Sequence, residues 1–591
     1  MPDYQAPVKD MLFVLNELTG LDQIAGLPGF EEATPDLVAA VLEEAAQFAS
    51  EVIGPVNTIG DASGTRVENG QVFVADEFKV AYQQFVAHGW GGVSQSTGAG
   101  GQGLPHTVGL AVEEMWQSAS LAWSLCPLLT HGAARAIEMH GDESLRGLVL
   151  EKMVSGEWTG AMNLTEAQAG SDLAAIRSQA VADGDGYRIT GQKIFITWGD
   201  HDMTDNVIHL VLARLPDAPP GVMGLSMFAV PKRQINADGS VGQPNNVTAV
   251  SVEHKLGING SPTCVMAFEK SYGYLIGAPN QGLRCMFTMM NDARLSVGLE
   301  GVAISERAYQ QALAYAKERV QGRAASQDDA VTIIHHPDVR RMLMTMKSYI
   351  EAMRSSAYVT SASLDRAQRE TDKAAKAAAQ ARVDLMTPIV KGWSTEVGQV
   401  LTSIGLQIHG GMGYIEETGA AQYLRDGRIT TIYEGTTGIQ AADLVGRKIL
   451  RDKGRALRAL IADVRSTDAE LAEYGKELKV IRAALAVALE DLVSATDWLF
   501  ANHSRSVDVP GAVSFNLLML MGTLAGGWQM ARAAAAAAAH LSDGNADKGF
   551  YEAKIITARF YAEQVMPVVG AYRKAIESGS DTIMALTEDQ F

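Results

Sequence analysis

The spacing of hydrophobic residues changes twice along the chain and so divides it into helical and β segments. From residue 35 to about residue 156, apolar residues recur three or four positions apart, as on one face of a helix. The first such stripe consists of Leu37, Val41, Ala45 and Phe48. We therefore expect an N-terminal leader over 1–34, followed by a helical domain over 35–160.

The middle of the chain has the shorter period of β-strands. Segments 187–190 and 193–196 flank a short polar and glycine turn, and segment 206–212 is rich in β-branched residues. This pattern predicts a β domain over 161–280.

Helical spacing then returns and continues almost to the end of the chain. One stripe predicts a long helix and consists of Leu295, Leu299, Val302, Tyr309, Leu313, Ala316 and Val320. A second stripe follows a charged stretch and consists of Leu478, Ile481, Leu485, Leu489, Leu492 and Leu499. These stripes predict a C-terminal helical bundle over 281–450 and an appended helical domain over 451–591. The expected fold class is α+β.

Composition narrows the class of protein. The chain has 591 residues, of which 47% are hydrophobic and 20% are charged, as in folded globular proteins. Its net charge of −19 opposes binding to nucleic acid or anionic lipid. Charged residues interrupt the N-terminal apolar segment, and the longest apolar stretch, 517–528, is too short to span a bilayer. Because there are only three cysteines and no CxxC pair, we expect a cytoplasmic protein without disulfides.

Two short motifs have more ordinary explanations than their patterns suggest. Residues 98–103 match GxGxxG, but they lie in a helical region rather than between a strand and a helix, so a surface loop is expected instead of a dinucleotide site. His335 and His336 are adjacent and therefore point in different directions. No metal site is expected there.

Two segments of the predicted β domain have residues suited to a polar, flat ligand. Segment 165–172 (TEAQAGSD) combines small residues with several hydrogen-bonding groups at the change from helix to strand, although such sequences are also common turns. Segment 195–199 (FITWG) places two aromatic residues beside a threonine at a strand end. Aromatic side chains there can pack on a flat ring or, more commonly, in the core of the domain.

A third feature lies in the predicted helical bundle. Residues 407–414 (QIHGGMGY) contain three glycines that permit close backbone approach to a ligand. Further on, Glu434 stands alone in an apolar and hydroxyl-rich stretch, directly before Gly435. Partial desolvation raises the pKa of such a carboxylate and makes it a better base, whereas a capping or surface glutamate is the ordinary alternative.

Together these motifs, in this order and spacing, resemble the acyl-CoA dehydrogenase family over about residues 35–450. Segment 165–172 is similar to the family's TEPGAGSD flavin loop, 195–197 to its W/F-I-T segment, 407–411 to its Q-x-x-G-G loop and 433–436 to its base motif. The leader and the extension after residue 450 resemble the long bacterial branch of the family. That resemblance implies bound FAD, an acyl-CoA substrate and a homodimer or homotetramer.

The resemblance also assigns roles to individual residues. It implies that Glu434 is the catalytic base and that substrate contacts Ser171, Asn291, Arg294 and Gly435. Arg319 is similar to an arginine that reaches the flavin diphosphate of a neighbouring subunit. The implied FAD-binding residues are Met162, Leu164, Thr165, Gly170, Ser171, Phe195, Ile196, Thr197, Arg319, Gln407, Gly410, Gly411, Thr436 and Gly438.

The sequence departs from the family pattern at several of these sites. Ala167 and Gln168 replace the proline and glycine of the flavin loop, and Gly438 replaces a glutamine after the base motif. Arg319 begins a segment that is one residue short and lacks the family's phenylalanine. Some relatives place the base on the preceding helix, at the position of Ala293, which cannot accept a proton. Glu434 is then the expected base.

The implied reaction is α,β-dehydrogenation of an acyl-CoA to a trans-2-enoyl-CoA, with an electron-transfer flavoprotein as electron acceptor. Within the long branch the resemblance points to 3-(methylthio)propanoyl-CoA in dimethylsulfoniopropionate breakdown. Cys285, Met286, Met289 and Met290 suit a thioether pocket, although methionine is more often core filler. An acyl-CoA oxidase or flavin monooxygenase of the same fold stays open as an alternative. A non-catalytic DNA-binding relative is opposed by the net charge and by Glu434.

Overall fold

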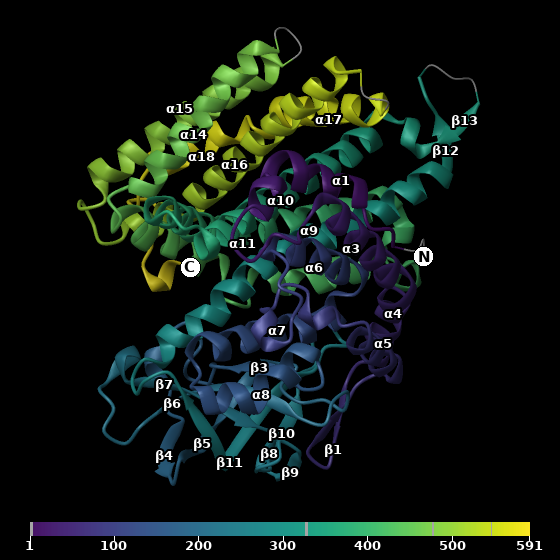
Figure 1. Cartoon of the computed structure of the whole chain (residues 1–591). Coiled ribbons are helices and arrows are strands. Elements are labelled where there is room, and N and C mark those ends of the chain that lie inside the picture. Colours follow the sequence, from purple (N-terminus) through teal and green to yellow (C-terminus); the bar gives the residue numbers. More distant parts are fainter. Residues whose placement is uncertain (1–3, 326–328, 475–477, 545–546) are drawn as a thin grey trace.

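The computed structural model describes residues 4–325, 329–474, 478–544 and 547–591, so the first three residues of the expected leader lie outside it. The described chain forms a β domain at one end, helices through the centre and a further group of helices at the other end (Figure 1). The expected α+β class, with helical, β, helical and appended helical parts in that order, is confirmed.

The N-terminal helices precede the sheet and pack beside the central bundle. The larger ones are α3 (Pro35–Phe48), α5 (Asp76–Ala87), α6 (His106–Ala119), α7 (Leu121–His140) and α8 (Glu143–Ser155). In α3 the buried face comprises Val38, Leu42, Ala45 and Phe48. The expected stripe was therefore partly wrong, because Leu37 is exposed and Val41 only half-buried. Successive residues of a helix lie about 100° apart around its axis, so stripes that begin one residue apart lie on different faces. Tertiary packing decides which of these faces is buried.

Seven strands of the described chain form the main sheet. They are β3 (Thr159–Asn163), β4 (Gln179–Asp183), β5 (Gly186–Thr197), β6 (Val207–Arg214), β7 (Leu225–Pro231), β10 (Val247–Val252) and β11 (Thr263–Ile276). Strand pairs run from β5 through β11, β7, β6 and β4 back to β5, so the sheet closes on itself. The predicted turn inside β5 was wrong. The strand continues through Gly191, whose missing side chain leaves room for Ser178 of the neighbouring segment.

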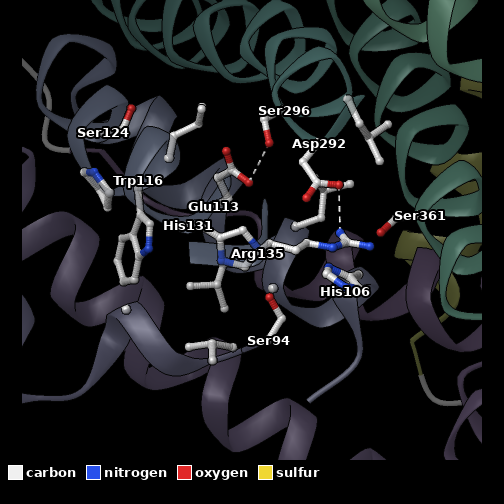
Figure 2. Close-up of a pocket in the computed structure, with 18 of the residues that line it drawn as sticks. Ser94, His106, Glu113, Trp116, Ser124, His131, Arg135, Asp292, Ser296 and Ser361 are labelled. Carbon is white, nitrogen blue, oxygen red and sulfur yellow. Dashed lines mark hydrogen bonds and ion pairs between the residues drawn. The ribbon is translucent and has the colours of Figure 1, made fainter. Parts of the chain in front are cut away.

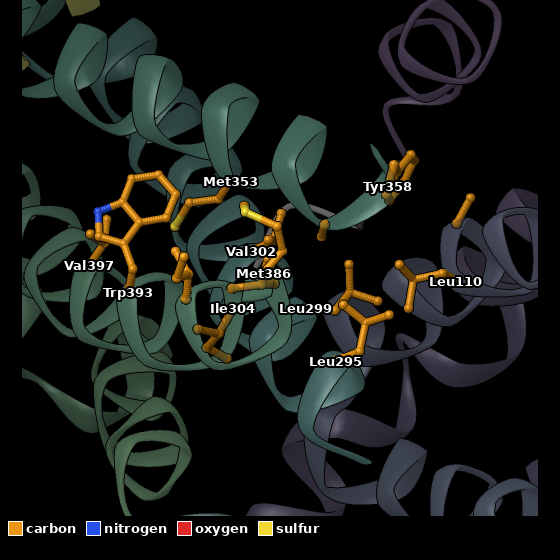
Figure 3. Close-up of a cluster of buried hydrophobic side chains, with 14 of the residues drawn as sticks. Leu110, Leu295, Leu299, Val302, Ile304, Met353, Tyr358, Met386, Trp393 and Val397 are labelled. Carbon is orange, nitrogen blue, oxygen red and sulfur yellow. The ribbon is translucent and has the colours of Figure 1, made fainter. Parts of the chain in front are cut away.

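Three long helices form the centre of the molecule: α9 (Gly282–Glu318), α10 (Pro337–Arg369) and α11 (Lys373–His409). Their facing side chains form a continuous apolar core (Figure 3). Helix α9 ends one residue before Arg319, so Val320, expected in the helical stripe, is instead exposed in strand β12 (Val320–Arg323). Strand β12 pairs with β13 (Ala330–Thr332) in a hairpin that projects from the bundle (Figure 1).

The C-terminal helices cover one side of this bundle (Figure 1). They are α14 (Arg455–Glu473), α15 (Lys479–Asn502), α16 (Val509–Ser542), α17 (Lys548–Phe560) and α18 (Val568–Glu577). The six predicted stripe residues from Leu478 to Leu499 are all buried. Among the described residues, α16 is the one helix long and apolar enough to cross a membrane, but 72% of its apolar window is buried in protein. Its composition is explained by packing within the fold.

Candidate active site

Glu434 lies on a sharp turn between the segment after α12 (Ala420–Gly427) and helix α13 (Thr437–Asp443). Glu434 and Gly435 both have left-handed backbone conformations, with φ of 53° and 89°. This conformation is unfavourable for a residue with a side chain and persists only where the surroundings hold it. Thr436 caps α13, since its hydroxyl accepts a hydrogen bond from the backbone N–H of Ile439 at 3.3 Å.

Side chains from three helices hold the turn by its carbonyl groups. Arg294 of α9 donates to the Glu434 carbonyl at 3.4 Å, and Gln440 of α13 donates to the same oxygen at 3.1 Å. Lys391 of α11 donates to the Gly435 carbonyl at 2.7 Å. The carbonyl groups of both Glu434 and Gly435 are therefore held by hydrogen bonds from neighbouring helices.

The Glu434 carboxyl has the properties of a general base at neutral pH. Burial raises its pKa to about 7, although the nearby cations Arg294 and Lys391 act in the opposite direction. A base whose pKa lies near the working pH accepts a proton efficiently while a substantial fraction of it is deprotonated. Glu416 and Glu417, the other carboxylates near the glycine loop, are exposed, and Glu416 pairs with Arg425. Glu416 and Glu417 therefore lack the burial that raises the pKa of Glu434.

A buried ion pair organises the loop over 165–172. Lys193 of β5 donates to the Glu166 carboxylate at 2.8 Å and to the carbonyls of Leu164 and Leu212. Glu166 also accepts hydrogen bonds from the backbone N–H groups of Arg177 and Ser178. Burial opposes ionisation of Glu166, but these partners outweigh it and lower the pKa to about 2. The loop therefore carries a fixed buried charge at its base.

The rest of this loop and the adjoining strand end face open space. Gly170 and Ser171 are exposed, and a side chain at Gly170 would meet nothing within 4 Å. The Thr165 carbonyl accepts a hydrogen bond from the Ile194 backbone at 2.9 Å, which ties the loop to β5. Phe195 is 60% exposed and has a positive φ of 58°. A small-residue loop beside an exposed aromatic ring suits a flat, polar cofactor such as FAD.

The remaining predicted residues of the β domain are less exposed. Leu164 and Ile196 are buried, whereas Met162 and Thr197 are half-buried. Trp198, the second aromatic of the FITWG segment, is buried in the core and donates to the Ala122 carbonyl at 3.1 Å. It serves packing rather than an exposed surface.

The predicted residues at the far end of the bundle form a separate group. Arg319 is exposed beside the β12–β13 hairpin, which lies far from β5 and β11 in Figure 1. Gln407, Gly410 and Gly411 are exposed at the end of α11 and in the following turn. The expected cofactor residues are therefore not all brought together within one chain.

The expected substrate residues are divided between two environments. Arg294 is buried against the Glu434 turn, and Gly435 is part of that turn. Asn291 and Ser171 are exposed. Thr436 and Gly438, expected to contact cofactor, are also exposed at the start of α13.

A cavity of about 100 Å³ lies beside the α9 turn that carries Arg294, and Ala293 and Leu295 line it. Its polar groups come mainly from α6, α7 and α9 (Figure 2). Ser296 donates to Glu113 at 3.0 Å, and Arg135 pairs with Asp292 at 2.7 Å. Burial raises the pKa of Glu113 to about 7, against the hydrogen bonds from Ser296 and Gln117. The four sulfur-containing residues at 285–290 do not line this cavity and pack in the core.

Several charged residues of the site were not predicted from the sequence. Lys391 and Glu300 are completely buried, and Glu113 lies in the cavity wall. Lys391 and Glu300 are single charges within apolar helical segments, the same signal that drew attention to Glu434. Their partners are distant in sequence, so the signal alone does not show which group each contacts.

Four segments of the chain match models of known protein domains. Residues 38–157, 161–271 and 280–450 match the N-terminal, middle and C-terminal domain models of acyl-CoA dehydrogenases. Residues 457–587 match a domain described as acetyl-CoA dehydrogenase C-terminal like.

Full-length relatives and solved structures agree with these matches. The chain is 47% identical to 3-methylmercaptopropionyl-CoA dehydrogenase of Ruegeria pomeroyi, over 98% of this chain and 99% of that protein. It is 35% identical to the broad-specificity linear acyl-CoA dehydrogenase FadE5 of Mycobacterium tuberculosis, over the full length of both. The fold is similar to that of Caenorhabditis elegans ACDH-11 in complex with C11-CoA, with a TM-score of 0.78, 19% identity and coverage of 99% of this chain and 96% of that one. It is also similar to an acyl-CoA dehydrogenase from Bacillus anthracis complexed with FAD, with a TM-score of 0.74, 20% identity and coverage of 95% and 91%. The chain belongs to the acyl-CoA dehydrogenase family.

Proposed function

We propose that this protein catalyses the FAD-dependent α,β-dehydrogenation of an acyl-CoA thioester, with Glu434 as the base. The observation that carries the proposal is the Glu434 turn, which presents a carboxyl of pKa about 7 from a backbone anchored by Arg294, Lys391 and Gln440. An α-proton next to a thioester is only weakly acidic, so its removal needs a base held in a fixed position.

The residues of the chain have distinct tasks in this reaction. Glu434 takes the α-proton, and its backbone N–H would stabilise charge on the thioester oxygen, an effect typically of about 3–4 kcal/mol per donor. FAD, when bound, supplies the acceptor for the hydride that leaves the β-carbon. The product is a trans-2-enoyl thioester.

The proposed FAD site combines two parts of the molecule. Phe195, Thr165 and Ser171 hold the flavin side, with Met162, Leu164, Gly170, Ile196 and Thr197 completing this part of the site. Arg319, Gln407, Gly410 and Gly411 would serve a second FAD, whereas Thr436 and Gly438 follow Glu434 at the start of α13 and would contact the first. Because strand β12, which directly follows Arg319, lies far from the β domain of the same chain, these two groups would hold one FAD only across two subunits of a homodimer or homotetramer.

The proposed substrate is 3-methylmercaptopropionyl-CoA, the compound named for the relative that is 47% identical. Neither Glu434 nor Arg294 lines the small cavity, so this choice of substrate rests on the similarity to that relative. In this pose Asn291, Arg294, Ser171 and Gly435 contact the substrate. Cys285 and the neighbouring methionines are not proposed as a thioether pocket, because their side chains are packed in the core.

The proposed electron acceptor is an electron-transfer flavoprotein.

The three cysteines are buried and unpaired, which supports a reducing, cytoplasmic location. Neither the net charge of −19 nor the buried character of α16 favours nucleic acid or membrane as a partner.

Turnover of purified protein with a panel of acyl-CoAs tests the reaction and the substrate together. We expect FAD to be released on heating, and reduction of an artificial dye to be fastest with 3-methylmercaptopropionyl-CoA or another short acyl-CoA. Oxygen consumption is measured in parallel. Rapid oxygen uptake without dye would identify an oxidase, and a nicotinamide in place of FAD would contradict the proposal.

A further inference from the structure

We propose that Glu300 is a positioning residue for Glu434, acting through the hydroxyl group of Tyr433. This inference rests on the proposed function, in which Glu434 is the base, and adds a residue on α9 that does not itself touch the substrate. Tyr433 directly precedes Glu434, so a restraint on its ring limits how the catalytic turn can move.

The contact between Glu300 and Tyr433 is specific and buried. Glu300 has no exposed surface, and its Oε2 accepts a hydrogen bond from the Tyr433 hydroxyl. Within the described residues, the other carboxyl oxygen, Oε1, has no hydrogen-bond partner. Core packing alone is better served by an apolar side chain at such a place, since an unsatisfied buried oxygen is unfavourable. The Tyr433 hydroxyl is the one polar group that Glu300 binds among those described.

Lys391 and Glu300 each bind one of the two residues that flank Glu434 in the chain. Lys391 of α11 is also fully buried and binds the carbonyl of Gly435, the residue after Glu434. Glu300 of α9 binds the side chain of the residue before it. The catalytic residue is thus held between two neighbours that are anchored to different helices. Such anchoring suits a turn with left-handed φ values, which would otherwise relax.

The charges around Glu300 determine which form of its carboxyl makes this contact. Burial raises its pKa to about 8, and the carboxylates of Glu113 on α6 and Glu434 act in the same direction. The Tyr433 hydrogen bond and Lys391 act in the opposite direction. At neutral pH the carboxyl is therefore mainly protonated, so glutamine is a close chemical substitute for it. Leucine removes the hydrogen-bond acceptor while keeping a similar volume.

A double-mutant cycle tests the proposal. We compare Tyr433→Phe, Glu300→Leu and the double variant by the rate of flavin reduction under anaerobic acyl-CoA and by the equilibrium binding of acyl-CoA. Each single variant is expected to reduce flavin roughly 10- to 100-fold more slowly, with binding changed less than about threefold, because the base is displaced but the ligand site is kept. The double variant should be no slower than the slower single variant, since both changes remove the same interaction.

Two further variants separate positioning from general damage to the fold. Glu300→Gln should retain a rate within about threefold of the wild type, because its amide oxygen still accepts from Tyr433. Glu351→Gln removes another buried carboxyl, on α10, that pairs with Lys347 and Lys554, away from the site. It should lower the melting temperature without slowing flavin reduction. If Glu300→Leu does not fold, Glu300→Met takes its place in the cycle.

The possible failures are distinguishable. If the wild-type protein does not reduce its flavin with any acyl-CoA, the proposed function is wrong. If the wild type is active and Glu300→Leu matches its rate, or if the two losses multiply in the double variant, the positioning role of Glu300 is wrong while the proposed function stands.

Discussion

Lys193 is the single residue on which the geometry of the proposed flavin loop most depends. Its ammonium group is fully buried and pairs with Glu166, so Lys193→Met leaves a buried carboxylate without its cation. Loss of one partner from a buried pair typically costs about 3–5 kcal/mol. We predict a lower melting temperature and a lower ratio of FAD to protein after gel filtration. Lys152→Met is the control, because its partner Glu157 is exposed, and it should retain the wild-type ratio. Full FAD content in Lys193→Met would show that the pair does not organise the site.

The residues of the site could be predicted from sequence only in part. Glu434 was identifiable because a lone carboxylate beside glycine stands out in an apolar segment. Glu300 and Lys391 gave a similar local signal, yet their roles depend on Tyr433 and Gly435, more than 40 positions away in the chain. Pairing across such distances is a property of the tertiary fold, so it was not accessible from one sequence.

At the scale of elements, the C-terminal helices join the bundle through a close contact between α16 and α11. A side-chain carbon at Gly522 would lie 2.2 Å from the Trp393 ring, so the two helices approach only because glycine is present. We predict that Gly522→Ala lowers the melting temperature, despite the better helix propensity of alanine, because overpacking typically costs about 1–3 kcal/mol. Gly511→Ala in the same helix meets no neighbour and should be neutral or stabilising by up to about 1 kcal/mol. Equal effects of the two changes on thermal unfolding would contradict this view of the interface.

Elements were easier to predict than their faces and ends. The long helices and the β domain followed from the period of hydrophobic residues, as in α15 and its N-cap Leu478, where every predicted stripe residue is buried. The buried face of α3, the uninterrupted course of β5 and the end of α9 before Arg319 were not predicted correctly. Each depends on contacts with other segments, which local spacing does not contain.

At the scale of the whole molecule, a buried charge network links the N-terminal segment to the C-terminal helices. Asp10 pairs with Arg354 of α10 at 2.6 Å and with Lys554 of α17. Burial alone would raise the pKa of Asp10, but these two cations outweigh it and hold the pKa well below its usual range. A lowered pKa in the folded state stabilises the protein above the unfolded-state value of about 4, and the stabilisation is lost as the pH falls below it.

Asp10→Asn should therefore lower the melting temperature most near neutral pH. The difference from the wild type should shrink progressively as the pH falls below about 4, because the aspartate of the unfolded chain then takes up a proton while Asp10 of the folded protein stays charged. The control, Glu552→Gln, removes an exposed partner of Lys548 on the same C-terminal helix and should have little effect. A difference that is the same at pH 7 and at about pH 2 would show that Asp10 does not stabilise the fold through its charge.

Assembly is the second prediction at this scale. Because Arg319 lies away from the β domain of its own chain, Arg319→Ala should reduce FAD retention only by removing a contact to the FAD of a neighbouring subunit. Sedimentation together with flavin absorbance measures both properties. A fully FAD-loaded wild-type monomer would exclude this role for Arg319.

The central claim, that Glu434 is the base of an acyl-CoA dehydrogenation, is tested most directly by anaerobic bleaching of the flavin in Glu434→Gln. Glutamine nearly preserves the shape of the side chain but cannot accept the α-proton, so the variant should stay yellow and bind acyl-CoA. Its flavin should bleach on the order of 100- to 10,000-fold more slowly than that of the wild type, as expected for loss of a general base. The measurement needs no electron acceptor and so reports arrival of the hydride alone. Bleaching of the variant at a near wild-type rate would contradict the claim.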